Sequence, residues 1–328
     1  MNAQPRTERF SLLRLFFVNQ GLCIFLALLF VAFAWARPTM IYASTLVTIL
    51  KSISILVLMT IGVTWIIATG QLDISFVGSA AVANMLAAWL VLNGYGWGLG
   101  IACGLIAGAA IGIVNGYLIG YFGLSSLIVT IATGAVSMSV AEGIGAGASL
   151  GMNSAGWMGE LVSATIGVVP IIAIGVGAAC FLGWYSQEKL LWGHYIYAQE
   201  LNYVAVVEAG INVKRLNLLL FVFSSVMASV AGILLTAALS SGNAGIMWPY
   251  MVDGLTAIFL GSMAIRKGQP NILGTIVGSG ILAVLNSGSG LMGWTDYQQS
   301  IIKGALLLIG IFLLVRFGTE RVSEVVEA

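Results

Sequence analysis

The sequence predicts an all-α membrane protein, a polytopic helical bundle of about ten transmembrane segments, some broken or short, with both termini cytoplasmic. Composition is one reason, because 59% of the 328 residues are hydrophobic and only 8% are charged, whereas a soluble domain carries roughly 25% charged residues. Repetition is another, because apolar stretches recur along nearly the whole chain, each approaching the roughly 17–25 residues that cross a bilayer. The placement of Lys and Arg between these stretches indicates the orientation.

The first span is predicted at 16–36, behind the cationic residues Arg6, Arg9 and Arg14. No small-residue cleavage site is evident before Arg37, so this segment is predicted to be retained rather than removed as a signal peptide. The later spans are apolar runs between polar or glycine-containing turns, and the third, eighth and ninth are expected to be broken or short. They fall near 44–68, 72–92, 96–120, 124–141, 161–184, 215–240, 251–265, 270–289 and 298–317.

Lys and Arg concentrate on the cytoplasmic side of membrane proteins. With the N-terminus inside and an even number of spans, three of the 13 Lys and Arg residues fall outside, namely Arg37, Lys51 and Lys303. A miscounted span would scatter this ten-to-three bias, so the bias supports both the count and the orientation. The residues placed inside are Arg6, Arg9, Arg14, Lys189, Lys214, Arg215, Arg266, Lys267, Arg316 and Arg321.

This topology divides the chain into a cytoplasmic N-terminus (1–15), a transmembrane region (16–317) with one long cytoplasmic loop (185–214), and a cytoplasmic tail (318–328). The net charge of +1 excludes the basic surface of a nucleic-acid-binding protein. The single histidine, His194, has no carboxylate or cysteine at ligand or triad spacing. The sequence therefore predicts neither a metal site nor a catalytic nucleophile.

Glycine is abundant, with 42 residues, and is often spaced four apart, as in Gly104, Gly108, Gly112 and Gly116. Small residues at this spacing lie on one helix face and let two helices approach closely in lipid. The spacing predicts a tightly packed bundle, without by itself indicating a function.

A polar segment, 69–79, interrupts the apolar sequence after the second span and contains Gln71, Asp73 and Ser75. An Asp at membrane depth costs ~2.5–3.5 kcal/mol, so a chain accepts it mainly where it lines a wet path or faces the protein interior. The charge bias places the segment near the cytoplasmic side. We interpret it as a gating element in which Asp73 caps a helix beginning near Ile74, with solute contact as the alternative.

Four further polar or aromatic residues are candidates for the translocation path or its gate. Asn243, Trp248 and Asp253 precede or begin the eighth span, and Asn286 lies in the ninth. The alternatives are that Trp248 anchors the chain at the membrane interface and that Asn286, like other amides in the spans, hydrogen-bonds neighbouring helices.

The loop 185–214 contains a short predicted helix of about two turns, with Asn202 as its N-cap and Gly210 as its C-terminal stop. Apolar residues, among them Tyr203 and Val207, lie between these two although charges surround the segment. So short a helix is marginal alone, and an exposed apolar surface usually has a partner. It either folds back on its own bundle or docks a separate cytoplasmic subunit, which is the interpretation we favour.

Several motifs follow one another between about residue 40 and residue 315. The loop reads Gly193-x-Tyr-Ile-Tyr-Ala-x-x-x-Asn202-x-x-Ala205-x-x-x-Ala209-Gly210-Ile211, and the polar segment is close to Gly-Gly-x-Asp-Leu-Ser-Val-Gly. Together they resemble sugar-type ABC importer permeases, the branched permease family that includes ribose, xylose and autoinducer permeases. The other matching motifs are Asn115-Gly116, 128–133, 241–245, Gly274-Thr275-x-x-Gly278, Leu285-Asn286-x-Gly288 and 298–304.

The resemblance implies a transport subunit without catalytic residues, which moves a small polar solute, such as a monosaccharide, by alternating access in the bacterial cytoplasmic (inner) membrane. It implies three partners: an ABC ATPase subunit that carries ATP and Mg²⁺, a second permease subunit, identical or different, and an extracytoplasmic solute-binding protein. The chain lacks the phosphate-binding sequence Gly-x4-Gly-Lys-Ser/Thr, so it is expected to bind no cofactor itself. The residues that the resemblance assigns to coupling with the ATPase are Tyr197, Asn202, Tyr203, Ala205, Val207, Ala209, Gly210 and Ile211.

The chain departs from the family pattern at three places. Gln71 replaces a glycine, Glu200 and Leu201 stand where the family has glycines, and Arg266-Lys267 occupies a turn that is usually rich in Ser and Gly. Two alternatives stay open: a secondary transporter or channel that acts alone, and a non-transporting half of a heterodimeric permease.

Overall fold

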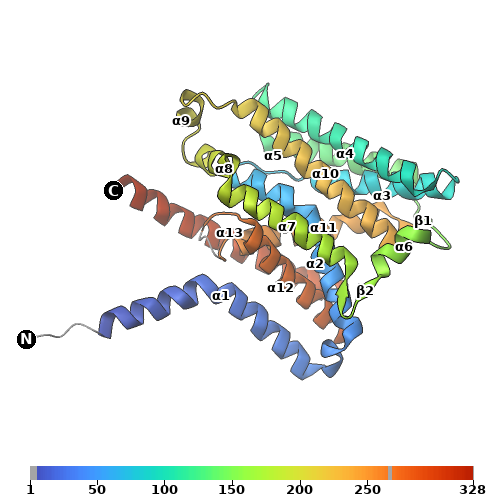
Figure 1. Cartoon of the computed structure of the whole chain (residues 1–328), viewed down its shortest axis with the longest axis horizontal. Helices are drawn as coiled ribbons and strands as arrows, with labels where there is room; N and C mark the ends of the chain where they lie inside the picture. Colours follow the sequence, from blue (N-terminus) through green and yellow to red (C-terminus); the bar gives the residue numbers. More distant parts are fainter. Residues whose placement is uncertain (1–5, 265–267, 328) are drawn as a thin grey trace, which may run out of the picture.

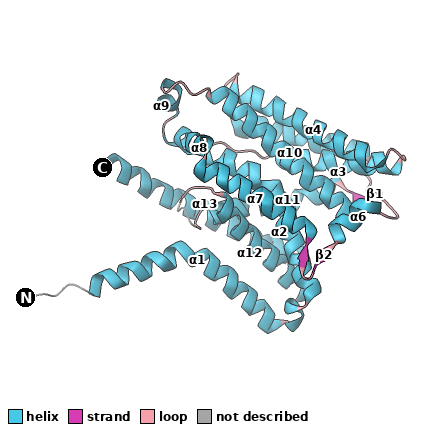
Figure 2. Cartoon of the chain, in the orientation of Figure 1, coloured by secondary structure: helices cyan, strands magenta, loops and turns pink. Residues whose placement is uncertain are grey.

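The computed structural model describes the backbone of residues 6–264 and 268–327 and the side chains of 21–264 and 268–316. Helices make up most of the described chain, and each strand has only two residues (Figure 2), which confirms the all-α class. The helices are α1 (Arg6–Ala36), η1 (Pro38–Ile41), α2 (Ala43–Ala68), α3 (Phe76–Leu92), α4 (Gly96–Gly120), α5 (Ser126–Ile144), α6 (Gly156–Ser163), α7 (Ile171–Lys189), α8 (Leu191–Leu201), α9 (Tyr203–Glu208), α10 (Val213–Leu239), η2 (Ala244–Met247), α11 (Trp248–Gly261), α12 (Ile272–Leu291) and α13 (Asp296–Glu327).

Seven helical segments of the described chain are long and apolar enough to cross a membrane, and Gly21–Ala36 and Phe76–Leu92 are shorter apolar helices. The count of about ten spans and the location of the termini stay predictions. Both α1 and α13 run without interruption through the predicted boundaries at 15/16 and 317/318, so no break in the helices marks those limits.

One predicted span begins later than expected. The segment predicted at 161–184 starts with the end of α6 and a small hairpin, in which β2 (Thr165–Ile166) pairs antiparallel with β3 (Val169–Pro170). Gly167 has a φ of +63° in the turn, a conformation that glycine adopts without strain. The helix itself, α7, therefore begins only at Ile171.

Helix α10 lies at the centre of one half of the bundle, where it packs against α2, α3 and α4, while α11 packs against α12 and α13 (Figure 1). Helix α9 lies at one end of the molecule, and α6 with β1 (Leu150–Gly151) and β2 lies at the opposite end (Figure 1). Strand β1 pairs antiparallel with β4 (Ser241–Gly242), which joins the segment before α6 to the segment after α10.

The glycine row of α4 faces α10, as the spacing predicts. A Cβ atom added at Gly112 would lie 2.6 Å from the Val222 Cα, and one added at Gly116 would lie 2.6 Å from the Leu218 Cα. Real Cβ atoms do not approach backbone so closely, so glycine sets the distance between these helices.

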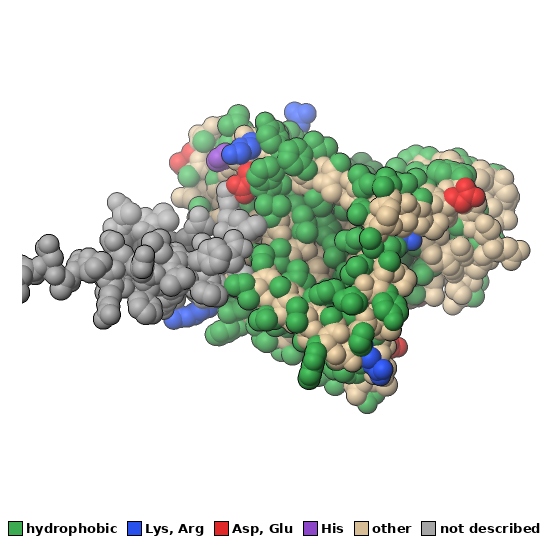
Figure 3. Space-filling model, turned by 60° about the horizontal axis from the view of Figure 1, so that its bottom comes forward, with side chains coloured by type: hydrophobic (Ala, Val, Ile, Leu, Met, Phe, Trp, Pro, Cys, Tyr) green, Lys and Arg blue, Asp and Glu red, His purple; other side chains and the backbone are tan. Residues whose placement is uncertain are grey.

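The outer surface is largely apolar. Figure 3 shows hydrophobic side chains over the body of the molecule and only sparse charged ones. Exposed large hydrophobic residues occur along most of the long helices, which is the distribution expected of a protein that lies in lipid rather than in water.

Candidate functional site

The polar segment predicted at 69–79 interrupts the helical structure between α2 and α3. Helix α2 ends at Ala68, Gly70 has a φ of +78°, and α3 begins only at Phe76. The non-helical part is therefore 69–75. Non-helical backbone is tolerated in a membrane protein where protein surrounds it or it borders a water-filled cavity.

Asp73 is fully buried and accepts hydrogen bonds with both carboxyl oxygens. Its Oδ1 accepts from the Ser75 amide over 2.8 Å and from the Ser75 hydroxyl over 2.6 Å, and its Oδ2 accepts from the Ser224 hydroxyl over 2.9 Å. The N-cap residue is Ser75, so α3 begins two residues later than the helix predicted to start near Ile74. Asp73 accepts a hydrogen bond from the backbone amide of the N-cap residue, but Asp73 itself lies two residues before the N-cap.

The hydrogen bonds of Asp73 continue into two further helices. The Asn115 Nδ2 of α4 donates to the Ser75 hydroxyl over 2.7 Å, and the Thr133 hydroxyl of α5 donates to the Asn115 Oδ1 over 2.7 Å. Because Ser224 belongs to α10, this polar cluster (Asp73, Ser75, Asn115, Thr133 and Ser224) ties the start of α3 to three other helices. Asp73 and Ser75 are fully buried, so neither side chain is exposed to solute in this conformation.

Gly70 and Gln71 lie at the beginning of the polar segment, and Gly70 lies near the loop 185–214. Gln71 is half-buried, and its Oε1 is buried without a hydrogen-bond partner among the described residues. A Cβ at Gly70 would lie 3.6 Å from the Cγ of Glu200 in α8. The predicted gate and the predicted coupling loop thus lie close together.

Asp253 and Asn286 lie together and share a third partner, Lys303, which the sequence analysis did not assign to a site. The Lys303 Nζ lies 3.0 Å from the Asp253 Oδ2, and the Asn286 Nδ2 lies 3.4 Å from the same oxygen. The ion pair joins α11 to α13, and the Asn286 hydrogen bond adds α12. Charges within spans usually pair with one another, and that rule was the available signal for Lys303.

Asn243 and Trp248 stand at the entrance of α11. The Asn243 side chain accepts a hydrogen bond from the Gly245 amide over 2.9 Å and so caps η2. The backbone amide of Asn243 donates to the Asn84 Oδ1 over 2.7 Å. Trp248 is 49% exposed. Neither lies in the cluster around Asp73 or the cluster around Asp253, so the structure does not bring the seven predicted path residues into a single site.

Trp248 does face the flank of the polar segment across an open pocket of about 310 Å³. Ile74 and Val77 contribute one wall, and Gly134 and Met138 of α5 contribute another. This pocket is the place where the segment after Asp73, α5 and the start of α11 meet. Its walls are apolar in this conformation.

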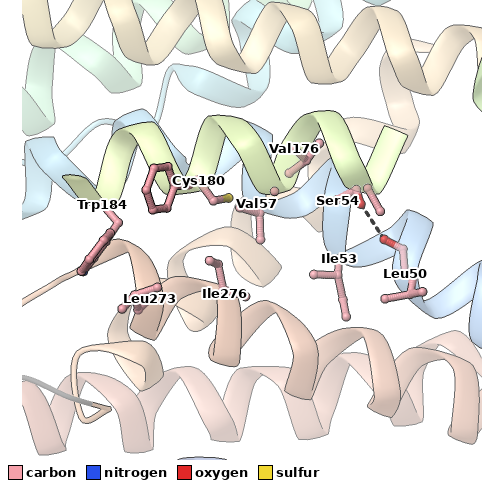
Figure 4. A pocket seen from close by; sticks show the side chains of 12 residues that line it. Leu50, Ile53, Ser54, Val57, Val176, Cys180, Trp184, Leu273 and Ile276 are labelled. Atoms are coloured by element: carbon pink, nitrogen blue, oxygen red, sulfur yellow. Dashed lines mark hydrogen bonds between the residues drawn. The ribbon is translucent and has the colours of Figure 1, made fainter. Parts of the chain in front are cut away.

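A second pocket of about 310 Å³ lies between α2, α7 and α12 and is shown in Figure 4. Its walls are apolar side chains such as Val57, Cys180 and Ile276, and the Ser54 hydroxyl already donates to the Leu50 carbonyl over 2.7 Å. Few polar groups are therefore available to a sugar in this pocket. No group of three His, Cys, Asp or Glu residues in the described chain could hold a metal ion.

The short helix predicted in the loop 185–214 is present as α9. The Asn202 side chain accepts from the Ala205 amide over 3.0 Å, so it is the N-cap. At the other end the Gly210 amide donates to the Val207 carbonyl over 2.9 Å and the Ile211 amide to the Val206 carbonyl over 3.3 Å. With Gly210 at a φ of +81°, this is a Schellman ending.

The coupling residues predicted in this loop fall into two groups. Tyr203 and Val207 of α9 are 50% and 46% exposed, and Ala205 and Ala209 are also exposed. Tyr197 of α8 is only 8% exposed. The first group is available to a docked subunit, whereas Tyr197 faces the interior of the chain.

Sequence reasoning missed the residues that complete these clusters. Ser224 and Thr133 are ordinary polar residues in apolar spans, and no local pattern marks them as partners of Asp73 or Asn115. Gln187 was passed over in the same way, although it is one of the few large amides at the end of a span and only 2% exposed.

Comparisons with known proteins agree with the motifs. Residues 45–311 match the family described as branched-chain amino acid transport system, permease component. The ribose import permease protein of Escherichia coli (strain K12) is 28% identical over 319 residues, which cover 95% of this chain and 98% of the relative. The L-arabinose ABC transporter permease protein of Azospirillum brasilense is 25% identical over 89% of this chain and 86% of the relative.

The D-allose transport system permease protein of Escherichia coli (strain K12) is also similar, at 25% identity over 91% of this chain and 92% of the relative. No solved structure matches the chain. Because the family model covers most of the sequence, from within α2 to within α13, the chain belongs to the family of branched-chain amino acid transport system permease components.

Proposed function

We propose that this chain is the membrane subunit of an ATP-driven importer and that a separate ATPase subunit docks on α9. The observation that carries the proposal is α9 itself. It is a helix capped at both ends that presents Tyr203, Val204 and Val207 to the outside, and it packs mainly against α8. A helix of six residues is too short to be stable alone, so both caps hold an apolar surface in place for a partner.

A sugar is the solute class that the relatives favour. The family description names branched-chain amino acids, whereas the similar proteins are named for ribose, L-arabinose and D-allose. We therefore propose a monosaccharide or a similar small polar compound. The apolar walls of the two pockets suggest that this conformation is not the one that holds the solute.

The remaining parts of the importer are proposed with it. The ATPase partner would hold ATP and Mg²⁺, and this chain no cofactor. A second permease subunit would complete the path, and a solute-binding protein would deliver the sugar at the end opposite to α9, with the chain in the cytoplasmic (inner) membrane of a bacterium. The relatives that are named import permeases or ABC transporter permeases support this arrangement in general terms.

The mechanism that fits this geometry is alternating access with the polar cluster as an inner gate. In the closed form, Asp73 and Ser75 tie the start of α3 to α4, α5 and α10. Docking and closure of the ATPase subunits would move α9 and α8, and Glu200 of α8 lies against Gly70 at the beginning of the polar segment. The gate opens when this segment shifts and the cluster separates.

Val207→Asp tests the docking surface. The substitution places a charge on an apolar surface that is already partly solvent-exposed, so the chain keeps its fold while the ATPase subunit loses its contact. Association with the ATPase subunit, measured by co-purification, and ATP-driven sugar uptake are both expected to fall at least about tenfold, the effect of losing a contact worth ~1.4 kcal/mol.

Val168→Asp is the matched control, because Val168 is also an exposed valine, 39% exposed, and follows Gly167 in the hairpin at the end opposite to α9 (Figure 1). It should bind the ATPase subunit like the parent chain. Unchanged association and uptake in Val207→Asp would reject α9 as the docking site.

A secondary transporter or channel is the competing function, and the relatives do not favour it. Such proteins also use broken helices, but ion coupling commonly depends on ionisable groups within the membrane. The described spans hold few, and Asp253 is already paired with Lys303. A non-transporting half of a heterodimeric permease would give no uptake unless a second, different permease subunit is present.

A further inference from the structure

A buried group of hydrogen bonds joins the cytoplasmic segment α8–α9 to the beginning of α12. Gln187 lies in the last turn of α7 and Tyr197 lies in α8, and they expose 2% and 8% of their surfaces. The Gln187 Nε2 donates to the Tyr197 hydroxyl over 2.7 Å, and this hydroxyl donates to the Pro270 carbonyl over 2.9 Å. The same Nε2 lies 3.3 Å from the Pro270 carbonyl oxygen.

Gln187 also accepts a hydrogen bond from the first turn of α12. The first amides of a helix have no acceptor within the helix, and Ile272 is the first residue of α12. Its amide donates to the Gln187 Oε1 over 3.1 Å, while the N-cap Asn271 accepts from the Gly274 amide over 2.7 Å. One acceptor of the α12 N-terminus thus comes from α7, a different part of the chain.

The contacts continue on both sides of this group. Toward the cytoplasm, Tyr197 lies in the helix that ends at Asn202, the N-cap of α9. Toward the bundle, the Thr275 and Thr64 hydroxyls are hydrogen-bonded over 2.9 Å, which links α12 to α2. Helix α2 then leads directly into the polar segment that contains Asp73.

We propose that Gln187 and Tyr197 are positioning residues that form a polar latch, through which a displacement of α9 moves the N-terminus of α12. The inference rests on the proposed function, because α9 is displaced when an ATPase subunit acts on it. Tyr197 is buried, so it transmits the movement and does not contact the ATPase subunit. Contiguous hydrogen bonds between helices are a physical route for such coupling.

Hydrogen exchange of the full-length chain alone tests whether the latch holds α12. Tyr197→Phe and Gln187→Met keep the size of each side chain but remove its hydrogen bonds. Exchange at residues 272–275 is expected to accelerate at least about fivefold, the effect of losing one net hydrogen bond. Thr236→Val is the control, since it removes a buried hydroxyl that is hydrogen-bonded to Asn84, and exchange at 272–275 should not change in it.

Coupling is tested with the ATPase subunit and the binding protein present, by dividing the uptake of labelled ribose, arabinose or allose by the ATP hydrolysed. In both latch variants this ratio is expected to fall about two- to thirtyfold, the range for coupling residues, while co-purification of the ATPase subunit stays as in the parent chain. A variant that merely loosens the fold would lose assembly and hydrolysis together and keep the ratio.

The outcomes separate the two proposals. No ATP-driven uptake by the parent chain would reject the proposed function, and exchange at 272–275 would then decide alone whether the latch exists. Normal uptake by the parent chain, with an unchanged ratio or unchanged exchange in both latch variants, would reject the latch and leave the proposed function standing.

Discussion

At the scale of single residues, a few buried polar side chains hold helix ends in place. Asp73 is the clearest, because its carboxylate accepts hydrogen bonds both from Ser75, the N-cap of α3, and from Ser224 of α10. Removing it leaves these donors buried and unpaired, and an unpaired buried donor costs more than the net value of the hydrogen bond.

Asp73→Ala should therefore lower the free energy of unfolding by about 1–3 kcal/mol, which is measured as a lower midpoint of thermal unfolding in detergent. Glu142→Ala, at an exposed position of α5, is the control and should change stability by less than about 0.5 kcal/mol. If the two variants unfold at the same temperature, Asp73 does not hold the segment as described.

The ion pair between Asp253 and Lys303 makes a second prediction at this scale. Lys303→Met leaves a buried carboxylate without its cation and should cost about 3–5 kcal/mol, whereas Asp253→Leu combined with Lys303→Met should recover much of the loss. A double-mutant cycle on thermal stability measures this. Additive losses in the cycle would mean that the pair is not a stabilising contact.

Part of this residue-scale picture is readable from the sequence. The polar segment marks Asp73 because a carboxylate is rare in an apolar chain, and Asn202 and Gly210 mark the ends of α9 because capping rules are local. Ser224 lies 151 residues from Asp73 and Lys303 lies 50 residues from Asp253. Such pairs follow from how the helices pack, which one sequence does not specify.

At the scale of elements, the glycine row of α4 shows how spacing determines contact. Gly112→Ala places a methyl group 2.6 Å from the backbone of α10, and such overpacking should cost about 1–3 kcal/mol. Gly98→Ala, in the same helix but with open space around it, should be neutral or stabilising because alanine favours helix. Thermal unfolding of the two variants is the measurement, and equal destabilisation would contradict close α4–α10 packing.

Helix boundaries were predicted best where a long apolar run lies between polar or glycine-containing turns. Helices α2 and α4 lie almost where the runs 44–68 and 96–120 placed them. The start of the span predicted at 161–184 was wrong, because the apolar residues of a small hairpin continue into α7 without a change in composition. Arg266 and Lys267, the departure from the family pattern in the turn before α12, lie outside the described residues.

At the scale of the whole molecule, α9 and the polar segment belong to one connected system. The loop 185–214 lies near the polar segment at Glu200 and Gly70, and Tyr197 donates a hydrogen bond to Pro270, just before α12. The sequence predicted a coupling helix in the loop and a gate in the polar segment, each independently of the other. Their proximity, and the separation of the path candidates into different clusters, become visible only when the helices are assembled.

The most direct test of the central claim, that this chain is a permease driven by a separate ATPase, is sugar uptake into proteoliposomes of defined composition. We expect uptake of labelled ribose, arabinose or allose only when the ATPase subunit and ATP are inside and the binding protein is outside. Uptake by this chain alone, driven by an ion gradient and indifferent to ATP, would contradict the claim.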